Sequence, residues 1–179
     1  MEAFSIVKRF AQTPANRWPN GAGVTSELLG FAETASLTPF APRWRLSVAQ
    51  LIEPAVFSEL PGIWRTLLPV GAAVRLEVGG VVHEVADGSP LEFDGGISTR
   101  LVALSVPCYA VNLMVEALPR RAEVRLTRGA LDATALVAVA LRTGARCGAF
   151  DLVAPVPDSW PGAREEAWAI VRVGQPAAQ

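Results

Sequence analysis

Arg45 and Ser47 combine a permanent positive charge with a hydroxyl group on one face of a predicted strand. They alternate with Trp44, Leu46 and Val48, so an extended backbone would direct the polar pair to one side and the apolar residues to the other. An arginine that faces an enclosed space is costly unless it meets a carboxylate from the protein or from a ligand. The pattern therefore predicts a cavity wall that can bind an acid, with an internal salt bridge or plain solvent exposure as the alternative.

Arg65 is the second candidate for the same chemistry. It follows the Pro61-Gly62 turn and begins an apolar run, so its backbone position is set by a rigid turn near the mouth of a sheet or barrel. A guanidinium group can bind a small carboxylate through two parallel hydrogen bonds. The alternative is a rim arginine that caps nearby carbonyl groups.

Three further polar or aromatic residues could complete such a wall. Asn20-Gly21 is a strong turn signal, and a plain hairpin apex is its alternative interpretation. Trp18 would cover a pocket as a flat apolar surface or fill the core. Asn112 interrupts a hydrophobic run, and a buried amide needs partners that either a backbone bulge or a ligand can supply.

The elements that must position these residues are short strands. Apolar or alternating runs recur about every 8–12 residues between glycine, proline and aspartate, which is typical of a β-sandwich or barrel. We predict an all-β fold with strands at Phe4–Val7, Gly23–Phe31, Arg43–Ile52, Trp64–Val70, Val74–Val78, Val81–Ala86, Ser98–Val106, Tyr109–Glu116, Ala122–Thr127, Thr134–Arg142, Phe150–Ala154 and Ala167–Val173.

The clearest local unit is a hairpin around Gly79-Gly80. A two-residue loop there puts His83 opposite Leu76 on the inner face and Arg75 opposite Glu84 on the outer face. The register thus predicts an inward histidine and an outward ion pair.

Other segments are less regular. The alanine-rich stretch Ala133–Leu141 has helix propensity, but its alternation favours a strand. Residues 155–162 are predicted to form a loop, and the tail from Gly174 to fray.

Composition excludes several classes of function. The chain has 179 residues, of which 51% are hydrophobic and 18% charged, enough for one folded domain with a sizeable core. The net charge is −1 without a basic run, which argues against nucleic acid as a partner. Its apolar stretches are too short to span a membrane, and the absence of an apolar signal core, with only two cysteines, predicts a cytoplasmic protein. Neither a nucleophile elbow nor a phosphate loop is present.

Five phrases combine tryptophan, asparagine or arginine with turn residues: Trp18–Thr25, Trp44–Ala49, Phe57–Arg65, Phe93–Gly95 and Asn112–Met114. In order and spacing these phrases resemble the HutD/Ves family of small bacterial proteins. The resemblance implies a cupin-like (RmlC-type) double-stranded β-helix or jelly-roll barrel in duplicated, bicupin form, here one unit, 1–179, with halves near 1–97 and 98–179. It also implies a connection with histidine utilisation or, for Ves members, stress responses, through binding of a small acid such as urocanate or formylglutamate.

The chain departs from the family pattern at three places. Ala22 replaces a glycine, Trp64 replaces an acidic residue before Arg65, and Ala110-Val111 replaces Asp-Phe before the asparagine. The missing acids could remove partners from the arginines, so a changed or lost ligand is one interpretation.

Histidine content bears on metal chemistry. Cupin metalloenzymes use several histidines and a carboxylate, and this chain has only His83, with Glu77, Glu84 and Glu92 as possible helpers. We therefore expect no metal and no cofactor, and a histidine satisfied by a neighbouring hydrogen bond.

The resulting hypothesis is a non-catalytic small-molecule binder for a carboxylate, acting as a metabolite sensor or regulator. The alternatives are a metal-independent or weakly metal-dependent enzyme, such as an isomerase with His83 as general base, and an interaction protein whose pocket has decayed. A homodimer through an edge strand is a further expectation. The candidate ligand-binding residues are Arg45, Arg65, Asn20, Ser47, His83, Asn112 and Trp18.

Overall fold

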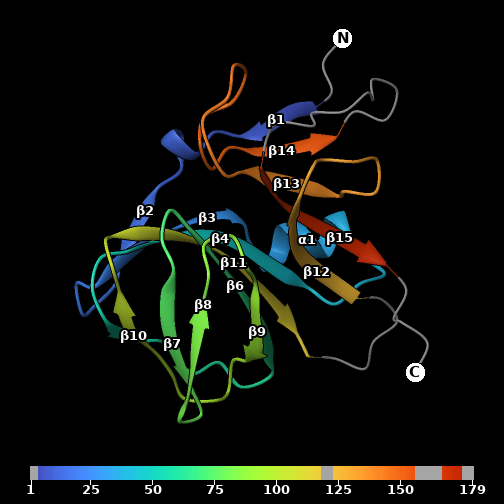
Figure 1. Ribbon diagram of the computed structural model, residues 1–179. Helices are drawn as coiled ribbons and strands as arrows, with labels where there is room; N and C mark the ends of the chain where they lie inside the picture. Colours follow the sequence, from blue (N-terminus) through green and yellow to red (C-terminus); the bar gives the residue numbers. More distant parts are fainter. Residues whose placement is uncertain (1–3, 118–122, 156–166, 175–179) are drawn as a thin grey trace.

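Short alternating segments separated by turn residues form a structure made almost entirely of β-strands (Figure 1). The computed structural model describes residues 4–117, 123–155 and 167–174. All strand pairs in these ranges are antiparallel. Each of the twelve predicted segments overlaps an observed strand, so the all-β prediction is confirmed.

A six-stranded sheet forms the middle layer. Its long central strands expose one face to each neighbouring sheet, because side chains alternate along a strand. In β4, Trp44, Leu46 and Val48 pack on one side, and Ala49 and Leu51 pack on the other. In spatial order the strands are β2 (Ala15–Arg17), β3 (Gly23–Leu29), β4 (Trp44–Leu51), β11 (Cys108–Glu116), β6 (Ile63–Val70) and β9 (Leu91–Asp94).

A four-stranded sheet covers one face of the middle layer. Its inner side chains, including Leu76 and Leu101, share a core with Leu67 and Ala110 of the middle sheet. Figure 1 shows this sheet in the lower part of the molecule, in front of β4 and β11. Its strands, in order, are β5 (Ala55–Val56), β10 (Thr99–Leu104), β7 (Val74–Val78) and β8 (Val81–Val85).

The hairpin of β7 and β8 has the predicted register. Gly79 and Gly80 both adopt positive φ, 56° and 83°, as the two central residues of a tight hairpin turn require. His83 lies opposite Leu76. On the outer face Arg75 Nε donates to Glu84 Oε1 at 2.6 Å, which confirms the predicted ion pair.

A five-stranded sheet covers the other face of the middle layer. The core between the two contains Trp44, Leu46 and Leu113 from the middle sheet and Leu126 and Val139 from the outer one. Figure 1 shows this sheet in the upper part of the molecule. In order its strands are β1 (Phe4–Lys8), β14 (Leu152–Pro155), β13 (Val137–Ala140), β15 (Trp168–Gly174) and β12 (Glu123–Gly129).

Asp151 ties the N-terminal segment to this outer sheet. Its buried carboxylate accepts hydrogen bonds from Arg9 Nη1, the Phe10 N–H and the Gly148 N–H, each at 2.9 Å. Three donors satisfy a carboxylate that would otherwise be costly to bury.

Some elements differ from the prediction. The strand predicted to reach Phe31 stops at Leu29, and a helix, α1 (Phe31–Leu37), follows it, where Glu33 Oε2 accepts the Gly30 N–H at 2.7 Å. Three short strands, β2, β5 and β9, and a 3-10 turn at Phe10–Gln12 were not predicted.

The remaining expectations have different outcomes. Ala133–Leu141 contains β13, so the strand interpretation is confirmed there. The loop predicted at 155–162 begins one residue too early, because Pro155 ends β14, and residues 156–162 lie outside the described residues. The tail predicted to fray from Gly174 is paired at that residue, which ends β15, and lies outside the described residues beyond it. The duplication into halves near 1–97 and 98–179 stays a prediction. Strands pair across that boundary, since β10 pairs with β7, and β11 pairs with β4 and β6. Within the described ranges, no helix has the length and apolar character that a membrane crossing needs.

Candidate functional site

A pocket of about 320 Å³ lies against the face of the middle sheet that carries Arg45 and Ser47. β4, β6 and β11 supply its floor, and its walls come from the turn between β2 and β3 and from the segment at and after β5. The lining residues are Trp18, Pro19, Asn20, Thr25, Arg45, Ser47, Ala49, Leu51, Val56, Phe57, Ser58, Leu60, Arg65, Leu67, Asn112 and Met114.

Arg65 is the most deeply placed charge in this pocket. Its side chain is buried, with 7% of the residue exposed, and among the described residues no carboxylate forms a salt bridge with it. Its recorded hydrogen bond runs from Nη1 to the Ser58 carbonyl oxygen at 3.4 Å, which is long. Burial, and secondarily the positive charge of Arg45, lowers the pKa of Arg65 to about 10. The group remains charged at neutral pH, but its charge is poorly compensated.

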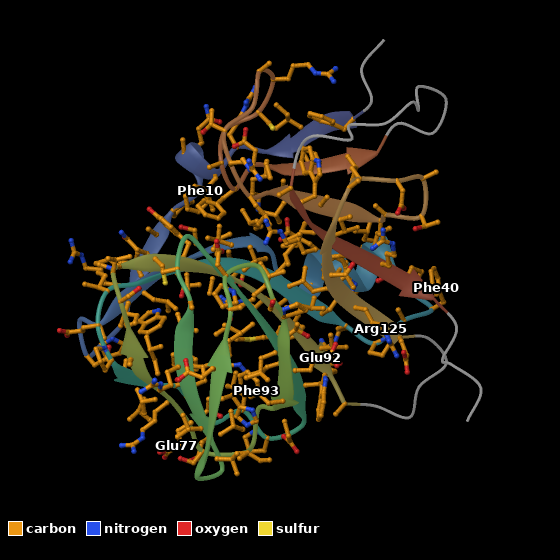
Figure 2. All side chains as sticks on the ribbon, in the orientation of Figure 1. Phe10, Phe40, Glu77, Glu92, Phe93 and Arg125 are labelled. Atoms are coloured by element: carbon orange, nitrogen blue, oxygen red, sulfur yellow. The ribbon has the colours of Figure 1, made fainter. Side chains whose placement is uncertain are left out.

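Two aromatic rings pack against the Arg65 side chain, and one glycine leaves room for it. Its Cζ lies 5.2 Å from the ring centre of Phe57 and 5.2 Å from that of Phe93, which is on β9 (Figure 2). A Cβ on Gly95 would lie 3.1 Å from Arg65 Cδ and 2.7 Å from the Ile63 carbonyl oxygen. Glycine at 95 therefore leaves the space that the arginine stem uses.

Arg45 is better compensated than Arg65. Its Nε donates to Glu27 Oε2 from the neighbouring strand β3, and its Nη1 lies 3.7 Å from Met114 Sδ. The side chain of Arg45 is 25% exposed, and that of Glu27 is 44% exposed. The salt bridge allowed as an alternative for Arg45 is therefore present, while the arginine also lines the pocket.

Ser47 and Asn112 lie side by side on the floor, because β4 and β11 pair at these two positions. Both residues are buried. Asn112 Nδ2 donates to the Ala110 carbonyl oxygen at 3.3 Å. Within the described part of the chain, no donor is recorded for Asn112 Oδ1 or for the Ser47 hydroxyl. Both groups can accept or share a hydrogen bond from a ligand.

Trp18 and Asn20 belong to the turn between β2 and β3. The Trp18 backbone N–H donates to the Gly23 carbonyl at 2.9 Å, and Asn20 Oδ1 accepts the Ala22 N–H at 3.1 Å, so Asn20 stabilises the predicted turn while it also lines the pocket. The Trp18 indole donates from Nε1 to Thr25 Oγ1 at 2.8 Å, which fixes the ring as a wall of the pocket. A Cβ at Gly23 would lie only 3.1 Å from that ring.

His83 lies apart from this group. Six of the seven candidate residues line the pocket, and His83 does not. It sits on β8, an edge strand of the four-stranded sheet, opposite the fully buried Leu76. Among the described residues, no cluster of three or more histidine, cysteine, aspartate or glutamate side chains has the arrangement of a metal site.

Sequence reasoning missed four residues that shape the site: Phe57, Phe93, Gly95 and Glu27. The first three lie in phrases that carry the family resemblance. Phe93 and Gly95 reach Arg65 because β9 pairs with β6, whereas Phe57 reaches it from the segment after β5. The sequence around Glu27 does not indicate a role in the site, since only the pairing of β3 with β4 brings this residue to Arg45.

The two positions where the family pattern expects acids have different surroundings. Trp64 faces away from the pocket, toward Glu92 and Arg125 on the side of β12 (Figure 2). Ala110 lies on the pocket side of β11 but is fully buried in the core. An acid at position 64 would therefore not have faced the pocket, which corrects the idea that its loss deprives Arg65 of a partner.

The chemistry available is recognition of an anion. Among the described residues that line the pocket, only the two arginines are charged, and the remaining polar side chains are hydroxyls, amides and the Trp18 indole. Leu51, Leu60 and Leu67 supply an apolar surface. A ligand with a carboxylate at one end and an apolar body fits this arrangement.

Comparison with known proteins adds family and fold. A sequence model of the family described as HutD matches residues 10–146. Protein Ves of Citrobacter koseri is 36% identical over 100 residues, which is 53% of this chain and 47% of the relative. The chain spans about half the length of the curated relatives it matches.

Two solved structures share the fold along nearly the whole chain. A conserved protein of unknown function from Pseudomonas aeruginosa PAO1 superposes with a TM-score of 0.72 at 24% identity, covering 97% of this chain and 100% of that one. HutD from Pseudomonas fluorescens SBW25 superposes with a TM-score of 0.71 at 22% identity, covering 98% and 100%.

Proposed function

The chain belongs to the HutD family, and we propose that it binds a small carboxylate in the pocket around Arg65 without transforming it. The observation that supports this most is a guanidinium group that is buried, lacks a carboxylate partner among the described residues, and lines an open pocket. Burying such a charge costs stability, and a ligand carboxylate would recover that cost. In this proposal the protein is a cytoplasmic metabolite sensor or regulator, connected with histidine utilisation or a stress response, and it forms a homodimer through an edge strand.

The geometry favours binding over catalysis. The isomerase alternative relied on His83 as general base, and this residue lies on β8, outside the pocket lining. The lining offers hydroxyls and amides but no carboxylate or imidazole that could move a proton. The open volume of about 320 Å³ also argues against a collapsed, decayed pocket.

The test is direct binding of acids by thermal shift and isothermal titration calorimetry, with urocanate and formylglutamate first. Arg65→Lys keeps the positive charge but loses the planar pair of donors, so we expect it to weaken binding roughly 10- to 100-fold. Arg75→Lys is the matched control, because Arg75 is an exposed arginine paired with Glu84 on the far sheet. Failure of every acid to stabilise or bind the wild-type protein would refute the proposal.

A further inference from the structure

The floor of the pocket has two rows of side chains that differ in hydrogen-bonding character. One row, across β4, β11 and β6, consists of Arg45, Met114 and Arg65. The next row on the same face, roughly 7 Å along the strands, consists of Ser47, Asn112 and Leu67. Guanidinium groups donate hydrogen bonds and do not accept them. An acceptor for a donor group of the ligand therefore has to come from the second row.

Asn112 presents such an acceptor to the pocket. Its Nδ2 donates to the Ala110 carbonyl oxygen at 3.3 Å, and because a carbonyl oxygen only accepts, this contact fixes which way the amide faces. Among the described residues, no donor is recorded for Asn112 Oδ1. The one side-chain polar atom of those residues that is both enclosed and unpaired is Trp168 Nε1. The oxygen of Asn112 therefore reaches accessible space, which is the pocket that this residue lines.

Asn112 is also sheltered, with 7% of the residue exposed, so a ligand in the pocket covers its oxygen completely. Covering a polar acceptor removes its hydration, and an acceptor that is buried without a donor is costly. An N–H group at that place avoids the cost, whereas a methylene group does not. The Ser47 hydroxyl sets no such requirement, because it can donate as well as accept.

We propose that Asn112 makes the pocket selective for acids that carry an N–H group, such as N-acylamino acids, over acids that carry a methylene group in its place. The carboxylate binds Arg65, and the N–H group donates to Asn112 Oδ1 in the neighbouring row. Urocanate and formylglutamate both carry an N–H group and belong to this narrower class. This inference rests on the proposed function, because it presupposes that the pocket binds acids.

The experiment compares acids in pairs that differ only at the N–H group. N-acetylglycine, 3-acetamidopropanoate and 4-acetamidobutanoate form a series of increasing length, and 4-oxopentanoate, 5-oxohexanoate and 6-oxoheptanoate replace their N–H by CH2. Urocanate is paired with 3-(thiazol-4-yl)acrylate, in which sulfur replaces the ring N–H. In the pair whose N–H acid binds most tightly, we expect calorimetric titration of the wild-type protein to give roughly tenfold tighter binding of that acid than of its counterpart.

Two asparagine variants test the role of Asn112. Asn112→Leu removes the acceptor at a similar volume, so we expect the ratio within the pair to fall below about twofold. Asn16→Leu is the matched control, because Asn16 is exposed on the edge strand β2, outside the pocket lining, and the ratio should stay at the wild-type value. Circular dichroism and melting curves establish that each variant folds, and Asn112→Ala replaces Asn112→Leu if the latter does not.

Arg65→Lys separates the two ends of the ligand. It acts on the carboxylate that both members of a pair share, so it should weaken both by the same factor and leave their ratio unchanged. A variant that merely loosened the pocket would likewise weaken both members. A fall in the ratio is therefore the readout that belongs to the acceptor of Asn112.

The outcomes distinguish failure of this inference from failure of the proposed function. Equal or tighter binding of the counterparts by the wild-type protein overturns the role of Asn112, as does tighter binding of any acid without an N–H group than of all four N–H acids. An unchanged ratio in Asn112→Leu, or an equal fall in Asn16→Leu, also overturns it. In each of these cases acids still bind and the proposed function stands. Binding of none of these acids, nor of any other, by the wild-type protein overturns the proposed function itself.

Discussion

Replacing Arg65 by methionine should stabilise the ligand-free protein while abolishing acid binding. Burial lowers the pKa of Arg65 to about 10, and a lowering of this size corresponds to roughly 3 kcal/mol of unfavourable free energy for holding the charge at neutral pH. Methionine has a similar reach and no charge. Loss of the two cation–π contacts with Phe57 and Phe93 offsets about 1–2 kcal/mol of the gain. The expected net effect is a rise of roughly 1–2 kcal/mol in the free energy of unfolding.

The assay is urea denaturation of wild type, Arg65→Met and the control Arg100→Met, with melting temperatures beside it. Arg100 is exposed and pairs with Glu77 through hydrogen bonds of 3.1 and 2.9 Å, so its loss should change the free energy of unfolding very little. Arg65→Met should melt about 3–6 °C above wild type.

The pH dependence has a definite sign. Because the folded-state pKa of Arg65 lies below its unfolded-state value, the unfolded chain holds more protons above pH 10, and the contribution of Arg65 to stability rises with pH there. Below pH 10 the penalty is fully present. The difference in stability between Arg65→Met and wild type should therefore shrink as pH rises above 10.

A loss of more than about 1 kcal/mol in Arg65→Met would refute this reasoning. It would mean that the guanidinium is a net structural support, held by its aromatic neighbours and the Ser58 carbonyl, and that no ligand is needed to explain its burial. A variant that is more stable and still binds acids would leave the energetic argument intact but remove Arg65 from the binding site.

Two further substitutions test how the site is held. Asp151→Asn should lower the free energy of unfolding by about 2–4 kcal/mol, since it removes a buried carboxylate that accepts hydrogen bonds from three donors. The control Glu77→Gln removes an exposed ion pair and should cost less than about 1 kcal/mol. Similar losses for the two variants in urea denaturation would contradict this expectation. Gly95→Ala should lower the free energy of unfolding by about 1–3 kcal/mol and weaken acid binding, because its Cβ would contact the Ile63 carbonyl oxygen and the Arg65 side chain. The control Gly129→Ala, whose nearest contact would be at 3.8 Å, should change stability and binding little. Unaltered binding in Gly95→Ala would show that the position of Arg65 does not depend on this glycine.

The parts of the fold that could be predicted are those where local pattern and tertiary burial agree. The hairpin of β7 and β8 is one, since Gly79-Gly80 and the flanking alternation specify turn, register and inner face together. The short strands β2, β5 and β9 have two to four residues, too few to show a period. They are strands because a neighbouring strand offers hydrogen-bonding partners, and this neighbour cannot be identified from the local sequence.

Helix α1 escaped prediction for a related reason. Residues 31–37 begin with an aromatic residue directly after a strand, and the helix lacks a side-chain N-cap. Its position depends on Thr34, whose Oγ1 accepts the Trp44 N–H at 3.0 Å across the fold. A contact ten residues away, made by a buried hydroxyl, leaves no local periodic signal.

Alternation located most of the candidate site but not its charge balance. It placed Arg45 and Ser47 on one face, where the structure has them lining the pocket. The same rule places consecutive residues of a strand on opposite faces, so an acid at position 64 would face away from the side chain of Arg65. Position 110 is different, because it shares a face with Asn112 and an acid there would lie on the pocket side.

The departure at position 110 therefore bears most directly on what the pocket binds. Ala110 is fully buried between the sheets and contributes no charge, so Glu27 is the acid paired with a lining arginine in the described part of the chain. An added carboxylate at 110 would bring the balance of the two arginines to zero and lower the attraction for any acid. With alanine there, the positive charge of Arg65 stays without an internal counter-ion among the described residues, and the pocket retains one unit of positive charge that a single carboxylate can neutralise.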